Sequence, residues 1–283
     1  MKKEFCSLLM VLSAGYFSYR SLVSTDDDFK NAPPTKFTPT ASTVGLRVPA
    51  VSVTPPSGQD CDITNVNELI EPNPEFHRNI EKELDAAVAA GGYRRMAETT
   101  TLAERMAAYV LATKCSKVGA NADLSFVSID SLMQITSQLC AAIPERDVAA
   151  PLTLIQDERM DGAPEAMLAA AKGALTQAKY LEYTDADPNQ VHYYLSLSEQ
   201  FGRRAAAIGF APAMAFMAEQ YDVGGFGQVE LTKAYVYAKQ IVWASQGESG
   251  RAGIDYLYSK MTRSQYDLAE DKVKRCNPLA MAR

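Results

Sequence analysis

From residue 73 onward, apolar residues recur every three or four positions, which is the period of helices that bury one face. In residues 211–221 this stripe consists of Met214, Met217, Ala218 and Tyr221. Residues 233–246 carry an answering stripe of small and apolar side chains: Ala234, Tyr237, Ala238, Ile241 and Ala244. Because neither helix can bury its stripe alone, the pattern predicts that the two pack together as a hairpin.

Helix start and stop signals predict further helices before this hairpin. One begins at Pro74, directly after Asn73, and ends before the glycine pair at residues 91–92. A second follows Thr101, whose spacing to Glu104 is that of a capping box, in which each side chain bonds a free backbone amide of the other residue. A third is expected over residues 129–143.

The later part of the chain is predicted to be helical as well. We expect helices over residues 164–181, after the cap signature at Asp187, and after Thr262, which precedes Gln265 by three positions. No segment has a convincing strand pattern with a partner strand. The fold class expected for residues 73–283 is therefore all-α, built of antiparallel helix pairs.

Composition and charge narrow the class of function. The chain has 283 residues, of which 47% are hydrophobic and 22% charged, so it can bury a substantial core. Its formal net charge is −6. Nucleic-acid binding needs a basic stripe that neutralises phosphates, and isolated arginine pairs do not supply one. We therefore expect no nucleic-acid partner.

The first 23 residues have the features of an export segment. Lys2 and Lys3 precede an apolar run over residues 5–19, and Arg20 and three aspartates follow it. Since the run is shorter than a comfortable membrane span of roughly 20 residues, a cleaved signal peptide and a retained membrane anchor are both open. In either case the charge pattern predicts that the bulk of the chain lies outside the cytoplasm. It would then be periplasmic, or anchored in the membrane and facing outside the cytoplasm. A buried N-terminal helix is the other alternative, which the proline-rich sequence that follows disfavours.

A spacer is expected between the export segment and the helices. Residues 24–72 are rich in Thr and Ser and contain several prolines: Pro33, Pro34, Pro39, Pro49, Pro55 and Pro56. Proline lacks the amide donor that sheets and helices need, so this composition favours an extended linker. With a retained anchor, the linker would hold the helical domain away from the membrane surface.

The cysteine count agrees with an oxidising compartment. Beyond Cys6, the chain contains an even number of cysteines: Cys61, Cys115, Cys140 and Cys276. Three pairings are possible. We favour Cys115 with Cys140, because each lies late in a predicted helix of one hairpin-like region, which leaves Cys61 with Cys276. Four buried free thiols remain the alternative.

The hairpin over residues 207–247 resembles the Sel1-like repeat, a subclass of tetratricopeptide-type helical repeat. The residues that match its pattern are Ala213, Tyr221, Gly224, Gly225, Gly227, Lys233, Ala234, Tyr237, Ala244 and Gly247. Met217 and Ala218 depart from the Leu-Gly of the family, and Gln228 lengthens the loop by one residue. The resemblance covers this one unit. It implies a right-handed solenoid of helix pairs with a concave partner-binding face and no catalytic residues.

Aromatic residues are the candidates for such a binding face, because Tyr and Trp are favoured at interaction hot spots. Tyr180, Tyr183, Tyr193 and Tyr194 flank one predicted turn, and Tyr235 and Trp243 fall off the apolar stripe of their helix. The residues that we select as partner-binding are Tyr235, Trp243, Tyr193 and Tyr194. Packing between helix pairs is the alternative.

An enzymatic site is not recognisable. Neither His77 nor His192 belongs to a catalytic motif, and no Cys-x-x-Cys suits zinc. The glycines at residues 224–227 lack the strand and the Lys-Ser/Thr of a phosphate-binding loop. The carboxylates at residues 157–161 precede a helix start, where acidic groups are ordinary. We expect no catalytic, cofactor or metal site.

The sequence thus predicts an exported or envelope-anchored helical-repeat protein that binds a protein partner or acts as a scaffold. A cell-envelope hydrolase with an unrecognised site is one alternative. A secreted effector or inhibitor, which would use the same helical surface to block an enzyme, is another alternative.

Overall fold

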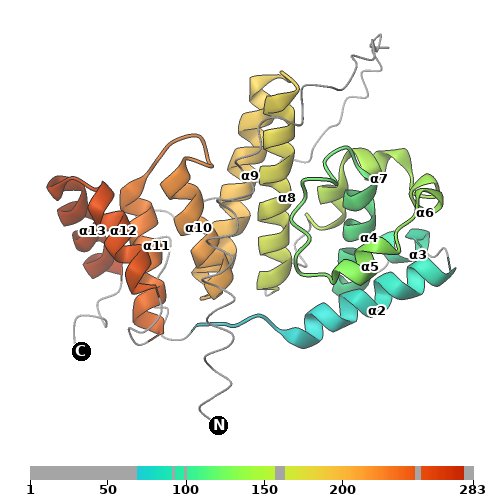
Figure 1. The fold of residues 1–283 in the computed structure, drawn as a ribbon, viewed down its shortest axis with the longest axis horizontal. Helices are drawn as coiled ribbons and strands as arrows, with labels where there is room; N and C mark the ends of the chain where they lie inside the picture. Colours follow the sequence, from blue (N-terminus) through green and yellow to red (C-terminus); the bar gives the residue numbers. More distant parts are fainter. Residues whose placement is uncertain (1–68, 91–92, 99–100, 157–162, 246–249, 277–283) are drawn as a thin grey trace. The chain divides into compact units, whose positions relative to one another are not determined.

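A computed structural model of the chain describes residues 69–90, 93–98, 101–156, 163–245 and 250–276. Every regular element in these ranges is a helix, and the only bridge between extended residues there pairs Ile70 with Phe210 (Figure 1). The prediction of an all-α fold is confirmed. The export segment at residues 1–23 and nearly all of the linker at residues 24–72 lie outside the described ranges.

None of the helices in these ranges is both long enough and apolar enough to cross a membrane. The apolar run at residues 5–19 precedes the described residues.

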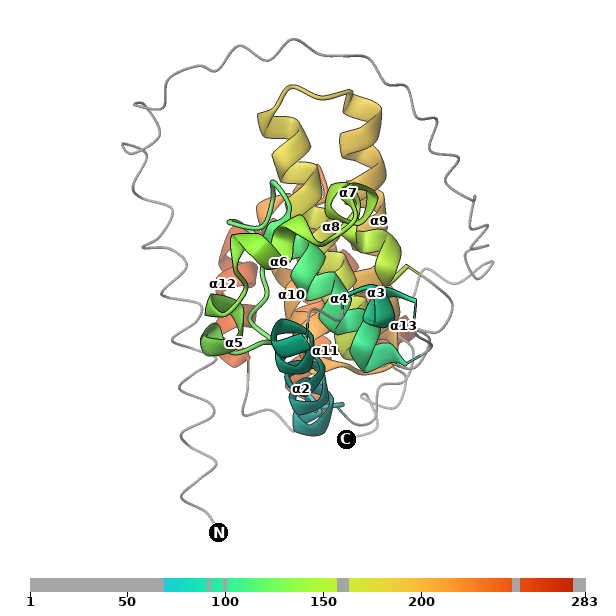
Figure 2. The same ribbon diagram turned by 90° about the vertical axis from the view of Figure 1, so that its right-hand side faces the viewer.

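The first group of helices surrounds α4 (Leu102–Cys115). Both α2 (Pro74–Ala90) and the short α3 (Tyr93–Ala97) pack against α4, and the short helices within residues 137–154 also return to it (Figure 2). Each residue of α4 from Met106 to Thr113 is buried. A helix that is enclosed on all sides needs apolar or small residues around its whole circumference, which this stretch has.

Four short helices follow α4: α5 (Ile129–Met133), α6 (Ser137–Ala141), α7 (Glu145–Ala149) and the 3-10 helix η2 (Pro151–Leu154). The single helix predicted over residues 129–143 is wrong, because the chain breaks between α5 and α6. Thr136 has extended backbone there, and its side chain accepts a hydrogen bond from the Leu139 amide. A threonine that bonds the backbone in this way starts a new helix in preference to continuing the old one.

The two longest helices are α8 (Pro164–Tyr183) and α9 (Pro188–Ala207), each of 20 residues. They pack along each other (Figure 1). Small residues make the close approach possible, and those of α8 that are buried are Ala166, Ala169, Ala170, Ala171, Ala174 and Ala178. Asp187 caps α9 as predicted, since its carboxylate accepts a hydrogen bond of 2.9 Å from the Asn189 amide.

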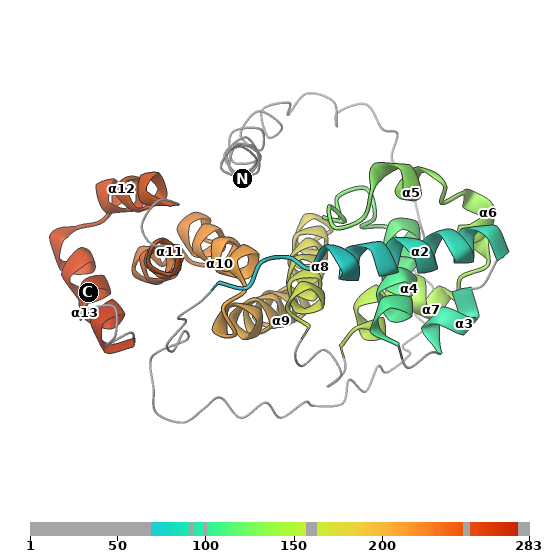
Figure 3. The ribbon, with the colours of Figure 1, turned by 90° about the horizontal axis from the view of Figure 1, so that it is seen from below.

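The chain continues as α10 (Ala211–Val223), α11 (Leu231–Ala244), α12 (Arg251–Lys260) and α13 (Arg263–Cys276). Of these, α10 packs on both α9 and α11, and α11 contacts both α12 and α13 (Figure 3). The predicted pairing of α10 with α11 is confirmed. The cap of α13 is reciprocal: the Thr262 amide donates to the Gln265 side chain at 2.9 Å, and the Gln265 amide donates to the Thr262 hydroxyl at 3.2 Å.

The cap at the start of α4 differs from its prediction. The Thr101 side chain bonds no amide of the first turn, and its hydroxyl donates instead to the Glu104 carboxylate. The two side chains of the predicted capping box therefore meet each other directly.

The residues before α2 form hydrogen bonds with helices that are distant in the sequence. The Ile70 amide donates to the Gly209 carbonyl at 2.8 Å, and the Ala211 amide donates to the Ile70 carbonyl at 3.2 Å, at the junction of α9 and α10. Further along, the Asn73 amide donates to the Glu165 carboxylate in the first turn of α8 at 2.9 Å.

Candidate functional site

The residues that define the Sel1-like pattern form the inside of the α10–α11 pair. Ala213, Tyr221, Ala234 and Tyr237 are each buried, with the rings of Tyr221 and Tyr237 stacked at a centroid distance of 5.8 Å. Gly224 ends α10 with a left-handed φ of 75°, a conformation that glycine adopts without steric cost. These residues therefore hold the pair together and offer no surface to a partner.

The remaining members of the pattern lie at the edges of this pair. Gly225 donates its amide to the Gln220 carbonyl at 2.7 Å, and Gly227 has a left-handed φ of 108°. The Lys233 ammonium lies 4.7 Å from the centre of the Tyr221 ring. Ala244 is the last residue of α11, and Gly247 lies outside the described residues.

Tyr235, a predicted partner-binding residue, is in the core. Its side chain is 1% exposed, and its hydroxyl donates a hydrogen bond of 2.6 Å to Glu270 in α13. Burial and the bond to the negatively charged Glu270 raise the pKa of Tyr235 above its usual value. The prediction that Tyr235 lines an accessible groove is therefore wrong. Tyr235 lies off the apolar stripe of α11, but α13 packs on that side of α11 and buries it.

The other three predicted partner-binding residues are accessible to different degrees. Tyr193 is 41% exposed, whereas Tyr194 and Trp243 are half-buried. The rings of Tyr193 and Tyr194 meet edge to face at a centroid distance of 5.2 Å. Trp243 is on α11 and the two tyrosines are on α9, so the four selected residues do not form one contiguous site.

An exposed aromatic surface occurs where α8 turns into α9. Tyr183, which our selection omitted, is 77% exposed in the last turn of α8, and Tyr193 follows in the second turn of α9. The turn is well defined, since Asp185 has a left-handed φ of 51° and the Ala186 amide donates to the Leu181 carbonyl at 3.0 Å. We call residues 179–194 the α8–α9 tip.

The α8–α9 tip carries an excess of acidic groups. Glu182, Asp185 and Asp187 are exposed there, with Lys179 as an exposed cation. Because α8 and α9 have 20 residues and the neighbouring α10 has 13, the pair is longer than α10 by roughly 10 Å at 1.5 Å per residue. The extra length gives the tip surface that α10 does not cover.

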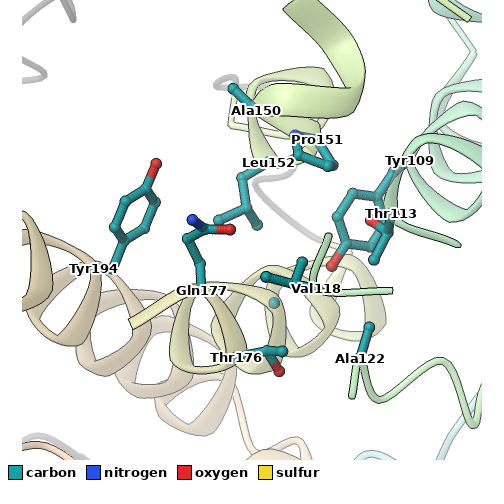
Figure 4. Close-up of a pocket in the computed structure, with 11 residues that line it drawn as sticks. Tyr109, Thr113, Val118, Ala122, Ala150, Pro151, Leu152, Thr176, Gln177 and Tyr194 are labelled. Atoms are coloured by element: carbon teal, nitrogen blue, oxygen red, sulfur yellow. The ribbon is translucent and has the colours of Figure 1, made fainter. Parts of the chain in front are cut away.

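A cavity lies between α4, η2 and the α8–α9 pair (Figure 4). We call it the Tyr109 cavity. The residues that line it are Tyr109, Thr113, Val118, Ala122, Ala150, Pro151, Leu152, Gly173, Thr176, Gln177 and Tyr194. The cavity, together with the solvent-filled space at its mouth, has a volume of about 330 Å³.

Two hydroxyls occupy the buried end of the Tyr109 cavity. Tyr109 is 2% exposed and Thr113 is 3% exposed, and they lie one helical turn apart on α4. Burial raises the pKa of Tyr109 to about 12, so this phenol is neutral at physiological pH and acts as a hydrogen-bond donor. Gln177 and Tyr194 lie on the α8–α9 side of the cavity (Figure 4).

An ion pair lies beside this cavity and joins two of the segments that surround it. The Lys172 ammonium in α8 lies 2.7 Å from the Asp123 carboxylate in the loop after α4. Burial alone would raise the pKa of Asp123, but Lys172 and hydrogen bonds from Ser125 outweigh it and hold the pKa below its usual value. The pair therefore stays charged and fastens the loop to α8.

The described residues contain one disulfide, between Cys115 at the end of α4 and Cys140 in α6. Their Cα atoms are 5.3 Å apart, and this is the pairing that the sequence analysis favoured. Cys61 lies outside the described residues, so the structure has no bearing on a bond between Cys61 and Cys276.

The residues weighed as enzymatic are scattered. His77 is half-buried in α2, and His192 is exposed in α9. The carboxylates at residues 157–161 fall outside the described ranges. Within those ranges, no group of three or more His, Cys, Asp or Glu side chains is placed to hold a metal ion.

Comparison with known proteins identifies no relative of this chain. No protein-family model matches the chain, and the searches of curated proteins and of solved structures found no significant match.

Proposed function

We propose that this chain is an exported helical-repeat protein that binds a protein partner through the α8–α9 tip. The observation that carries the proposal is the exposure of Tyr183 and Tyr193, at 77% and 41%, on the two sides of one well-defined turn. Tyrosine offers a large amphipathic surface at a low cost in conformational entropy, which is why it is frequent at interaction hot spots.

The rest of the helical domain supports the role of a binding protein. The α10–α11 pair, whose sequence resembles a Sel1-like unit, has a glycine turn and buried tyrosines, and α8 to α11 pack in sequence order. In a right-handed solenoid of such pairs, each pair contacts its neighbours and leaves an extended surface for a partner. The exposed carboxylates of the tip favour a partner surface rich in Lys or Arg.

The disulfide supports the proposed location. Bonds such as Cys115–Cys140 persist in oxidising compartments and are rare in a reducing cytoplasm. Together with the predicted export segment, it favours a periplasmic or membrane-anchored chain that faces outside the cytoplasm.

A site-specific cross-linking experiment tests the proposal. A photo-reactive residue in place of Tyr193 should give one discrete cross-linked protein in the native cells, and substitution of Tyr183 by Ser in that background should strongly reduce its yield. Tyr256 is the control, because it is also an exposed tyrosine, at 44%, but lies on α12. Equal loss with Tyr256→Ser, or no discrete product, would refute partner binding at the tip.

A further inference from the structure

Residues 134–143 have few contacts that hold them to the rest of the fold. This segment contains α6, none of whose residues is buried. Its hydrogen bonds are local: the Cys140 amide donates to the Thr136 carbonyl at 3.1 Å, and the Ile143 amide donates to the Cys140 carbonyl at 3.2 Å. Among the described residues, no hydrogen bond or ion pair joins this segment to a residue outside 132–143.

The residues on either side of this segment are anchored by hydrogen bonds to distant residues. Before it, the Ser128 amide donates to the Glu81 carboxylate of α2 at 2.7 Å. After it, the Tyr93 hydroxyl of α3 donates to the buried Asp147 carboxylate at 3.0 Å. The segment therefore runs between two fixed ends.

The disulfide between Cys115 and Cys140 joins the middle of this segment to α4. Cys115 is the last residue of α4, and the preceding turns of α4 are buried in the core. The bond thus fixes α6 to a rigid part of the fold. Both cysteines are only half-buried, so a reductant can reach the bond from solvent.

An apolar cavity lies beneath the segment. Its lining consists of Leu139, Ala142 and Ile143 from the segment and of Ala87, Tyr93 and Leu111 from α2, α3 and α4. The cavity, together with the solvent-filled space at its mouth, has a volume of about 240 Å³. A cavity means that the segment packs incompletely on the residues below it, which reduces the dispersion contacts that hold it in place.

We propose that residues 134–143 form a redox-controlled lid over this apolar cavity, which the disulfide between Cys115 and Cys140 holds closed. A dithiol opens the lid by thiol–disulfide exchange. Its thiolate attacks one sulfur of the bond, and the other cysteine leaves as a thiolate and takes up a proton. The second thiol of the reductant then closes its own disulfide and releases the first cysteine as a thiol. Two electrons and two protons pass from the dithiol to the two cysteines.

Reduction acts on the lid more than on its surroundings. The loss of the bond restores conformational freedom to the segment, and α6, with five residues, is too short to be stable without tertiary contacts. The bonds to Glu81 and Asp147 do not depend on the disulfide, so the opening ends at these anchors. The open lid exposes Tyr93 and Leu111, which are buried in the oxidised chain.

Hydrogen–deuterium exchange of the full chain, measured by mass spectrometry with and without dithiothreitol, tests the proposal. Peptides within residues 134–143 should exchange at least tenfold faster after reduction, because the disulfide no longer opposes their opening. Peptides of α8 and α9 contain no cysteine and serve as the internal control. They should stay protected over the exchange times at which the lid exchanges.

Cys115→Ser with Cys140→Ser removes the disulfide of the lid without a reductant. The lid peptides of this variant should exchange as fast as those of the reduced chain, and dithiothreitol should not accelerate them further. The variant retains Cys61 and Cys276, so it separates the effect at the lid from that of their predicted bond. The comparison of oxidised and reduced unmodified chain tests the lid even if the double variant does not fold.

The proposal is overturned if the lid peptides exchange at the same rate in the oxidised and the reduced chain, with reduction verified by the mass of the alkylated cysteines. It is also overturned if α8 and α9 lose protection together with the lid, since the disulfide would then hold the whole domain. A response of the lid to dithiothreitol in the double variant would place the effect at another bond. None of these outcomes bears on partner capture at the α8–α9 tip, so the two proposals fail independently.

Discussion

The hydroxyl of Tyr221 in α10 donates a hydrogen bond of 2.6 Å to the Glu199 carboxylate in α9. The Lys233 ammonium in α11 lies 3.7 Å from the same carboxylate. Three successive helices therefore meet at one tyrosine, which is also the tyrosine of the Sel1-like pattern. The signature residue contributes packing within its own pair and a polar contact to the preceding helix.

Tyr221→Phe should lower the free energy of unfolding by about 1 to 3 kcal/mol, because it removes a hydrogen bond to a charged group and keeps the buried ring. Urea denaturation followed by circular dichroism measures the difference. Tyr183→Phe is the control, since Tyr183 is 77% exposed and its hydroxyl is accessible to water. Equal stability of the two variants would show that the bond contributes nothing.

Gly173→Ala should destabilise the domain despite the better helix propensity of alanine, because the new methyl group would clash with the Tyr109 hydroxyl in the core. We expect a loss of about 1 to 3 kcal/mol, typical of overpacking. Gly253→Ala in α12 is the matched change, since a Cβ at Gly253 meets nothing within 4 Å. That variant should gain up to about 1 kcal/mol. Thermal denaturation of both variants checks the opposite signs, and a gain at residue 173 would contradict the contact.

Removal of the disulfide by Cys115→Ser with Cys140→Ser should reduce stability by about 2 to 4 kcal/mol, since the bond closes a loop across a sequence separation of 25. The same loss should follow from dithiothreitol treatment of the unmodified chain, measured as a lower Tm. A further change in the Tm of the double variant on reduction would come from the predicted bond between Cys61 and Cys276. A Tm of the unmodified chain that is insensitive to reductant would mean that this bond does not form.

The contact of Glu270 with α11 should make stability depend on acid pH. Burial alone would raise the pKa of Glu270, but hydrogen bonds from Tyr235 and Lys239 outweigh it and lower the pKa below its ordinary value of about 4.3. A lowered folded-state pKa adds stability above the unfolded-state value, and this contribution is lost as the pH falls through the folded-state pKa.

Glu270→Gln should therefore cost about 1 kcal/mol at pH 7, a modest amount because Glu270 and Lys239 are partly exposed. The difference from the unmodified chain should shrink as the pH falls below the ordinary glutamate pKa of about 4.3 and through the lower folded-state pKa of Glu270. Denaturant titrations at pH 7 and pH 3.5 measure both values. A difference that is constant across this range would contradict a charge-dependent contact.

Local patterns predicted the α10–α11 pair well. The stripe with Met214 and Met217 and the glycine at residue 224 are signals within a few positions of one another, and the structure has the helices and the turn where they indicate. The cap at Thr262 is another local signal of this kind. Such features depend on neighbours in the sequence, which a single chain displays directly.

Contacts between distant residues could not be predicted. Tyr235 lies off the stripe of its helix, and only the return of α13 from 35 positions away places Glu270 against it. From the sequence alone, Gly173 is a residue that weakens a helix. Its role depends on the contact with Tyr109 of α4, which the sequence does not show. The Tyr109 cavity has the same origin, since its walls come from segments that no sequence pattern connects.

The bridge between Ile70 and Phe210 determines where mechanical load enters the fold. A pull on the chain from its N-terminal side reaches Ile70 before it reaches α2, and Ile70 is held by two backbone hydrogen bonds at the start of α10. Tension would therefore be transmitted first to the junction of α9 and α10. If the N-terminal segment is attached to a membrane and the proposed partner binds at the tip, force between them would run along α9 without passing through the helices around α4.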